Sequence, residues 1–234
     1  MPVALKFTVV FFDFGGTLLK PRRDRILQVI LSNQGIAVPL PRIHEAHHLA
    51  DSWWEDLHGG TVFWQQEHKR AFNLFVLEKL GLAADRVLAE RLATAIIKQW
   101  DKVQKTIEPE LYPEVLQYLQ RLRSRGYTLG LISNASPKDK EIVLSVGLDR
   151  YLNHIVISGI VGVAKPNPEI FHHALMLAAA SADEAIHVGD SYKADVLGAR
   201  SAGLGAVLID RDNRYRDFDC PRIRTLDELE SLLT

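Results

Sequence analysis

The strongest fold signal in the chain is the run Thr8-Val9-Val10-Phe11-Phe12-Asp13-Phe14-Gly15-Gly16-Thr17. Five β-branched or aromatic residues lead directly into Asp13 and then into a pair of glycines. A short apolar run that ends in a turn signal predicts a strand buried on both faces, as in a parallel sheet. Asp13 then lies at the carboxyl end of this strand, which is where open α/β sheets bind their ligands.

Apolar runs alternate with helical patterns beyond residue 113. The expected strands are 128–132, 155–158, 185–188 and 206–209, and the expected helices are 113–125, one that ends before Gly147, 168–180, 193–202 and 226–233. Strands separated by helices favour a parallel sheet covered on both faces. The predicted class is therefore α/β, with a doubly wound, Rossmann-like core.

The residues from about 20 to 105 contain no convincing strand. Helical spacing is present over 24–34, 41–57, 61–80 and 84–105, with Thr61 as the expected cap of the third helix. Four helices with short links predict a small antiparallel bundle. The predicted domains are a Rossmann-like core of residues 1–20 and 106–234 and an inserted helical-bundle cap of residues 21–105.

Polar residues follow three further apolar runs, and each suits the handling of an anion or a cation. The Ser133 hydroxyl and the backbone N–H groups near Asn134 could hold anionic oxygens. The Lys165 ammonium, in Ala-Lys-Pro-Asn-Pro, would offset negative charge. Asp190, which ends His-Val-Gly-Asp, and Asp195 offer the hard oxygen ligands that Mg²⁺ prefers.

Taken in order, these motifs resemble the haloacid dehalogenase-like (HAD) hydrolases over nearly the whole core. The first motif of that family is usually D-x-D-x-T. Asp13 matches its nucleophile and Thr17 its threonine, whereas Gly15 stands where the phosphatases of the family carry a second aspartate.

The resemblance implies a mechanism and a set of site residues. Asp13 would attack the substrate to form a covalent aspartyl intermediate that water then hydrolyses. It implies that Asp13 and Lys165 are catalytic, that Phe14, Gly15, Thr17, Ser133 and Asn134 bind the substrate, and that Asp13, the Gly15 carbonyl, Asp190 and Asp195 bind Mg²⁺. A cap over such a site would exclude water and select a small substrate.

Gly15 removes the group that normally protonates the leaving oxygen, and this leaves three functions open. The first is a phosphatase that takes its acid from the cap or acts on a substrate with a good leaving group. The second is 2-haloacid dehalogenase or phosphonatase chemistry; the latter would need a cap lysine, for which Lys69, Lys79 and Lys98 are candidates. The third is a weakly active or non-catalytic binding protein. The retained aspartate pair favours the Mg²⁺-dependent phosphatase, because dehalogenases of the family work without the metal.

Composition excludes several other classes. The 234 residues include 28 Lys and Arg against 29 Asp and Glu, so no nucleic-acid partner is expected. The longest later apolar run, 174–180, is far shorter than the ~20 residues that span a membrane, and the first residues lack a secretory-signal pattern. With Cys220 as its single cysteine, the chain is expected to be cytoplasmic. Its partner would be a small phosphorylated molecule, and the chain could be a monomer or a homodimer.

One histidine cluster lies outside these motifs. His44 and His48 are four residues apart on an expected helix, with His47 between them. A metal site needs further ligands, and the sequence near them supplies none. We therefore expect these histidines to serve packing.

Overall fold

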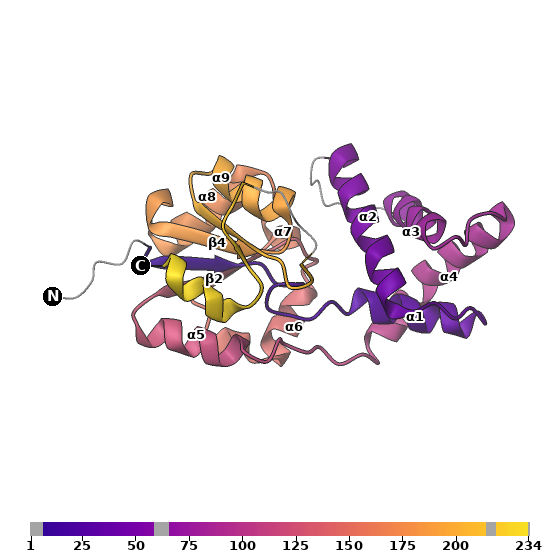
Figure 1. Cartoon of the computed structure of the whole chain (residues 1–234), viewed down its shortest axis with the longest axis horizontal. Helices are drawn as coiled ribbons and strands as arrows, with labels where there is room; N and C mark the ends of the chain where they lie inside the picture. The colour runs from indigo at the N-terminus through magenta and orange to yellow at the C-terminus, as the bar shows by residue number, and fades with distance from the viewer. Residues whose placement is uncertain (1–6, 59–65, 214–218, 234) are drawn as a thin grey trace. The chain divides into compact units, whose positions relative to one another are not determined.

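The computed structural model describes residues 7–58, 66–213 and 219–233. These residues form two compact units (Figure 1). The first contains residues 7–20 and those from 110 onward, and the second contains residues 21–58 and 66–109. Each unit has its own hydrophobic core.

The first unit is built on a six-stranded sheet in the order β3-β2-β1-β4-β5-β6. The strands are β1 (Val9–Phe12), β2 (Thr128–Ser133), β3 (His154–Ile157), β4 (Ala185–Gly189), β5 (Gly205–Ile209) and β6 (Arg222–Ile223). Every neighbouring pair is parallel. The sheet and its helices confirm the predicted doubly wound α/β class.

Helices cover both faces of the sheet, as Figure 1 shows. They are α5 (Val115–Ser124), α6 (Asp139–Ser145), α7 (Ser158–Val161), α8 (Pro168–Ala178) and α9 (Gly198–Ser201), with the 3-10 helices η1 (Leu148–Arg150), η2 (Ala182–Glu184) and η4 (Leu226–Leu232) and the π-helix η3 (Tyr192–Leu197). Residues of strand β1 contribute to the hydrophobic cores on both faces of the sheet. Val10 and Phe12 pack with α5 and η4, and Val9 and Phe11 pack with α8 and α9. This two-sided burial explains why β1 is apolar at every position.

The second unit consists of α1 (Arg23–Asn33), α2 (Leu40–His58), α3 (Gln66–Lys79) and α4 (Arg86–Gln104). Apolar residues at helical spacing, such as Ile26, Leu27 and Ile30 of α1, form its core with residues of the other three helices. Asp85 caps α4 by accepting hydrogen bonds from the N–H groups of Val87 and Leu88. The expected cap residue Thr61 lies outside the described residues.

Several elements differ from the sequence expectation. The strand expected over 155–158 is His154–Ile157, and Ser158 instead begins α7. The final helix is a 3-10 helix, and β6 was missed because it has only two residues, of which Arg222 is exposed. Periodicity cannot detect so short an edge strand.

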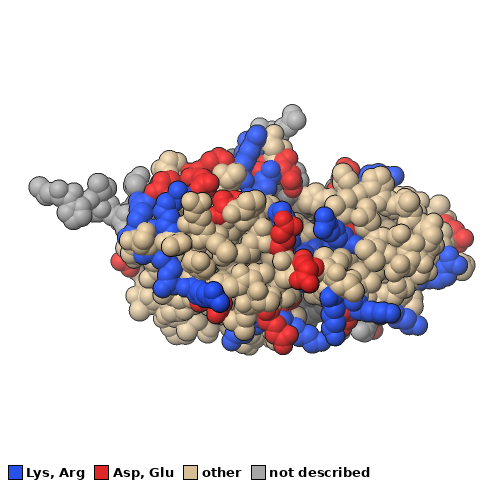
Figure 2. All heavy atoms as spheres, turned by 90° about the horizontal axis from the view of Figure 1, so that it is seen from below, with Lys and Arg blue, Asp and Glu red and all other residues tan. Residues whose placement is uncertain are grey.

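On the face shown in Figure 2, both basic and acidic side chains are present among other residues. Among the described residues, no helix combines the length and the apolar character needed to cross a bilayer.

Candidate active site

Three neighbouring strands carry the candidate site residues to one edge of the sheet. Asp13 follows the last residue of β1, Ser133 ends β2, and Asp190 follows the last residue of β4. Phe12 pairs in register with Leu131 on one side and with Val188 on the other. Parallel neighbours in this register bring their carboxyl ends to the same level.

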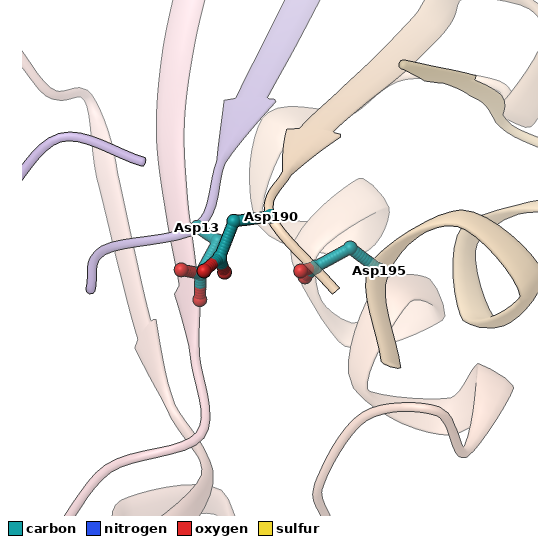
Figure 3. A group of neighbouring side chains, drawn as sticks. All are labelled: Asp13, Asp190 and Asp195. Atoms are coloured by element: carbon teal, nitrogen blue, oxygen red, sulfur yellow. The ribbon is translucent and has the colours of Figure 1, made fainter. Parts of the chain in front are cut away.

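Three carboxylates meet at this edge. Asp13, Asp190 and Asp195 each offer an oxygen within 4.8 Å of the others. Figure 3 shows the side chains of Asp13 and Asp190 leaving the ends of their strands, and Asp195 reaching toward them from the turn after β4. Asp13 and Asp195 are buried and Asp190 is half-buried.

Lys165 joins two of these carboxylates, although it lies 152 residues from Asp13 in the chain. Its Nζ donates to Asp13 Oδ1 and to Asp195 Oδ1, each at 2.6 Å. The side chain is only 2 % exposed. Asn134 holds the Lys165 backbone on both sides, donating from Nδ2 to the carbonyl and accepting from the N–H, each at 2.8 Å. The Asn134 side chain therefore positions the lysine.

His187 supports Asp195 from inside the sheet. Its Nε2 lies 2.9 Å from Asp195 Oδ1, and the ring is fully buried. Burial lowers the pKa of His187, so the imidazole is neutral. Because an ionised carboxylate only accepts hydrogen bonds, Nε2 carries the proton. The signal that could have revealed this residue is a polar side chain inside an otherwise apolar buried strand.

The three ionisable partners perturb one another. Burial is the largest influence on Asp13 and, with the charge of Asp195, raises the pKa of its carboxyl to about 6 against the pull of Lys165. Burial also opposes ionisation of Asp195, but Lys165 and His187 outweigh it and hold the pKa of that carboxyl well below its usual range. Burial opposes the charge on Lys165 too, yet the two aspartates raise its pKa. Lys165 is therefore a permanent cation.

The carboxylates fit a divalent cation. Three negative charges against the one positive charge of Lys165 leave the ionised site at −2. Hard carboxylate oxygens at this mutual distance are typical Mg²⁺ ligands. Two of the carboxylates pack directly against glycines, where a larger residue would not fit. A Cβ on Gly16 would lie 2.1 Å from Asp190 Oδ2, and a Cβ on Gly189 would lie 2.1 Å from Asp195 Cγ.

The remaining predicted residues lie in or beside the loop after β1. Thr17 is buried, and its Oγ1 has no hydrogen-bond partner among the described residues. The Phe14 side chain is buried in the core, and its carbonyl accepts from the N–H groups of Leu18 and Leu19. Gly15 is exposed, and a Cβ there would meet nothing within 4 Å. Ser133 is buried at the end of β2.

Known proteins resemble the chain in sequence. It is 36% identical over 159 residues to the phosphoserine phosphatase of Thermus thermophilus. The aligned region covers 67% of this chain and 61% of the relative. It is 33% identical over 153 residues to the glyceraldehyde 3-phosphate phosphatase of Methanopyrus kandleri, which covers 65% and 63% respectively. The chain thus spans about three fifths of the length of these two relatives.

Known structures resemble its fold. A magnesium-bound HAD-hydrolase from Bacillus subtilis superimposes with a TM-score of 0.74 at 19% identity, covering 98% of this chain and 99% of that one. The model of the family described as haloacid dehalogenase-like hydrolase matches residues 7–203. That match includes all three carboxylates, Lys165 and His187, and it shows that the chain belongs to the haloacid dehalogenase-like hydrolase family.

Proposed function

We propose that the chain is a Mg²⁺-dependent phosphatase that acts on a small phosphorylated metabolite through an aspartyl-phosphate intermediate. The observation that carries the proposal is the buried Lys165 held between Asp13 and Asp195, with Asp190 beside them. The names of two relatives, a phosphoserine phosphatase and a glyceraldehyde 3-phosphate phosphatase, support a small phosphorylated metabolite as the substrate class, without choosing between alkyl and acyl phosphates.

In this proposal, an Asp13 oxygen attacks phosphorus while the bond from phosphorus to the leaving oxygen breaks. Lys165 offsets negative charge on the transferred group, and its own contact with Asp195 keeps it in place. The backbone at Gly15, the unpartnered Thr17 hydroxyl and Ser133 would bind phosphoryl oxygens. Water then cleaves the aspartyl phosphate and regenerates Asp13.

Asp13, Asp190, Asp195 and the Gly15 carbonyl would hold Mg²⁺. When bound, the ion supplies positive charge that offsets the negative charge of the phosphoryl oxygens. Asn134 and His187 are proposed as positioning residues, since the first fixes the backbone of Lys165 and the second fixes the Asp195 carboxylate.

With glycine at position 15, the rate of the reaction depends strongly on how easily the leaving group departs. Without a carboxylate there, an alkoxide departs without the acid catalysis that typically contributes about 10²–10⁴-fold. We therefore propose a substrate with a good leaving group, such as an acyl phosphate. The phosphonatase alternative gains no support from Lys69, Lys79 or Lys98, because all three are exposed, whereas an imine-forming lysine is usually activated by burial.

The function is tested by phosphate release from acetyl phosphate, p-nitrophenyl phosphate and serine phosphate, with and without Mg²⁺. We expect Mg²⁺-dependent release that is fastest from acetyl phosphate. Asp13→Asn should abolish release, and the surface variant Asp149→Asn should keep it. Metal-independent halide release from 2-haloacids would instead establish dehalogenation. Ligand binding without turnover would establish the non-catalytic alternative.

Gly15→Asp tests the leaving-group argument. Because a Cβ at Gly15 meets no atom within 4 Å, the carboxylate can be accommodated. We expect a gain of about 10²–10⁴-fold on serine phosphate and little gain on acetyl phosphate. Gly15→Asn is the matched control, since it adds a similar volume without an acid. Equal rates for the Asp and Asn variants on serine phosphate would contradict the argument.

A further inference from the structure

In the helical unit, His44 and His48 of α2 lie against each other, and Asp24 of α1 contacts His44. The two histidines are four residues apart on one helix face, and their Nε2 atoms lie 3.1 Å apart. Their side chains are 26% and 23% exposed, so solutes can reach them. We propose that this pair is a binding site for a divalent transition metal of the zinc class, completed by water.

The distance between the two nitrogens suits a shared metal. Zinc–nitrogen bonds are about 2.0–2.1 Å long, which puts two ligand nitrogens roughly 2.9–3.4 Å apart for bond angles between a right angle and the tetrahedral angle. The observed 3.1 Å lies inside that interval. Imidazole nitrogen suits Zn²⁺, Ni²⁺ and Cu²⁺, whereas Mg²⁺ prefers oxygen.

Asp24 orients His44 as carboxylates orient metal-bound histidines. Asp24 Oδ2 lies 2.6 Å from His44 Nδ1, which places the proton on Nδ1 and the lone pair on Nε2. Its other oxygen lies 2.5 Å from Nδ1 of His47, whose ring is 2% exposed. Burial opposes ionisation of Asp24, but the hydrogen bonds from the two imidazoles outweigh it and hold the pKa of this carboxyl well below its usual range. Asp24 is thus a fixed anion.

The Asp51 carboxylate lies near Nδ1 of His48. His48 Nδ1 lies 3.9 Å from Asp51 Oδ2, and Arg23 holds Asp51 through Nη1 at 2.8 Å and through a second contact from Nη2. With the His44 proton on Nδ1, the lone pair of His44 Nε2 faces His48 Nε2, and either a proton or a metal ion can occupy the position between the two nitrogens. Asp24, Asp51 and Arg23 together contribute a charge of −1, which favours a divalent ion there.

The competing explanation for the short distance is a single proton shared by the two Nε2 atoms. A Zn²⁺ titration distinguishes this explanation from a metal site. The full chain is titrated calorimetrically in millimolar Mg²⁺, which is added to fill the proposed carboxylate site. We expect one Zn²⁺ per chain. His44→Ala and His48→Ala should remove this step, and His172→Ala, which alters an exposed histidine of α8, should retain it. Asp24→Asn should weaken binding about 10–100-fold without removing a ligand.

A second measurement keeps the test independent of variant folding. In ¹⁵N spectra of the wild-type chain, Zn²⁺ should shift the Nε2 resonances of His44 and His48 together. Failure of the wild-type chain to bind Zn²⁺, or equal affinity in His44→Ala and wild type, overturns the proposal and leaves the shared proton. Zn²⁺ binding without movement of these two resonances also overturns it. None of these outcomes depends on phosphatase activity.

Discussion

Asp13 is buried at the end of β1. The Lys165 ammonium favours the ionised form of its carboxyl, and the Asp195 carboxylate disfavours that form. The pKa of Asp13 is raised to about 6, mainly by burial, whereas an aspartate in an unfolded chain has a pKa of about 3.9. The folded state therefore binds more protons than the unfolded state between these values. Without metal, Asp13 favours folding most below pH ~4, and this contribution is lost as the pH rises through 6.

We expect Asp13→Asn to stabilise the metal-free chain at neutral pH, because the amide removes a buried charge. The rise of the Asp13 pKa to about 6 sets an upper bound of about 3 kcal/mol on the gain in the free energy of unfolding at pH 7, with no gain near pH 4. Urea unfolding in EDTA at both values measures it. The exposed Asp149→Asn variant should stay within about 0.5 kcal/mol of wild type. An Asp13→Asn variant less stable than wild type at pH 7 would contradict the electrostatic account.

At the scale of elements, two turns position the carboxylates. In the loop after β1, Gly16 has φ +80°, a left-handed conformation that side chains disfavour. After β4, η3 is a π-helix: the N–H of Val196 bonds to the carbonyl of Ser191 at 3.3 Å, five residues back. The N–H of Ser191 donates to Asp195 Oδ2 at 3.0 Å. This wide turn, of a kind frequent at functional sites, directs Asp195 inward.

Gly16→Ala tests the first of these turns. A methyl group there would lie 2.1 Å from Asp190 Oδ2, so the carboxylate must move. The left-handed backbone adds a cost of roughly 1–2 kcal/mol. We expect at least a tenfold loss of Mg²⁺ affinity by calorimetry, together with that loss of stability. Gly15→Ala is the matched control, because its Cβ meets nothing within 4 Å. Equal Mg²⁺ affinity in the two variants would argue against Asp190 as a ligand.

At the scale of the whole molecule, the chain contains separate hydrophobic cores. The core of the helical unit contains Leu92 and residues of all four of its helices, and that of the sheet unit contains Leu122 of α5. Both leucines are fully buried. Separate cores allow the two units to open independently, as cooperative subunits of a structure often do.

Leu92→Ala is expected to loosen the helical unit alone. Truncation of a buried leucine costs about 2–5 kcal/mol. Hydrogen exchange should accelerate in α1 to α4, while β1 to β5 and the Mg²⁺ affinity stay as in wild type. Leu122→Ala should give the reverse pattern. Equal acceleration of both units by Leu92→Ala would show that they unfold as one.

The layered architecture and the residue types at the candidate site are predictable from the amino-acid sequence alone. Runs such as Val9 to Phe12 are apolar at every position only when both faces are covered, and the aspartate that follows such a run must lie at the sheet edge. The order of the motifs also determined the family. The assignment of catalytic, substrate and metal roles to individual residues, and the boundaries of the cap, stay predictions.

The contacts between side chains, in contrast, depend on how the helices and strands pack in three dimensions. Periodicity reports how a segment is buried, but it does not identify partners that lie far away in the chain. The contacts of Lys165 with Asp13 and of Asn134 with Lys165 span 152 and 31 residues, and His44 meets Asp24 across two helices. Packing of whole elements sets those distances, so the histidine pair that the sequence assigned to packing became a metal site in our proposal only once α1 and α2 were placed together.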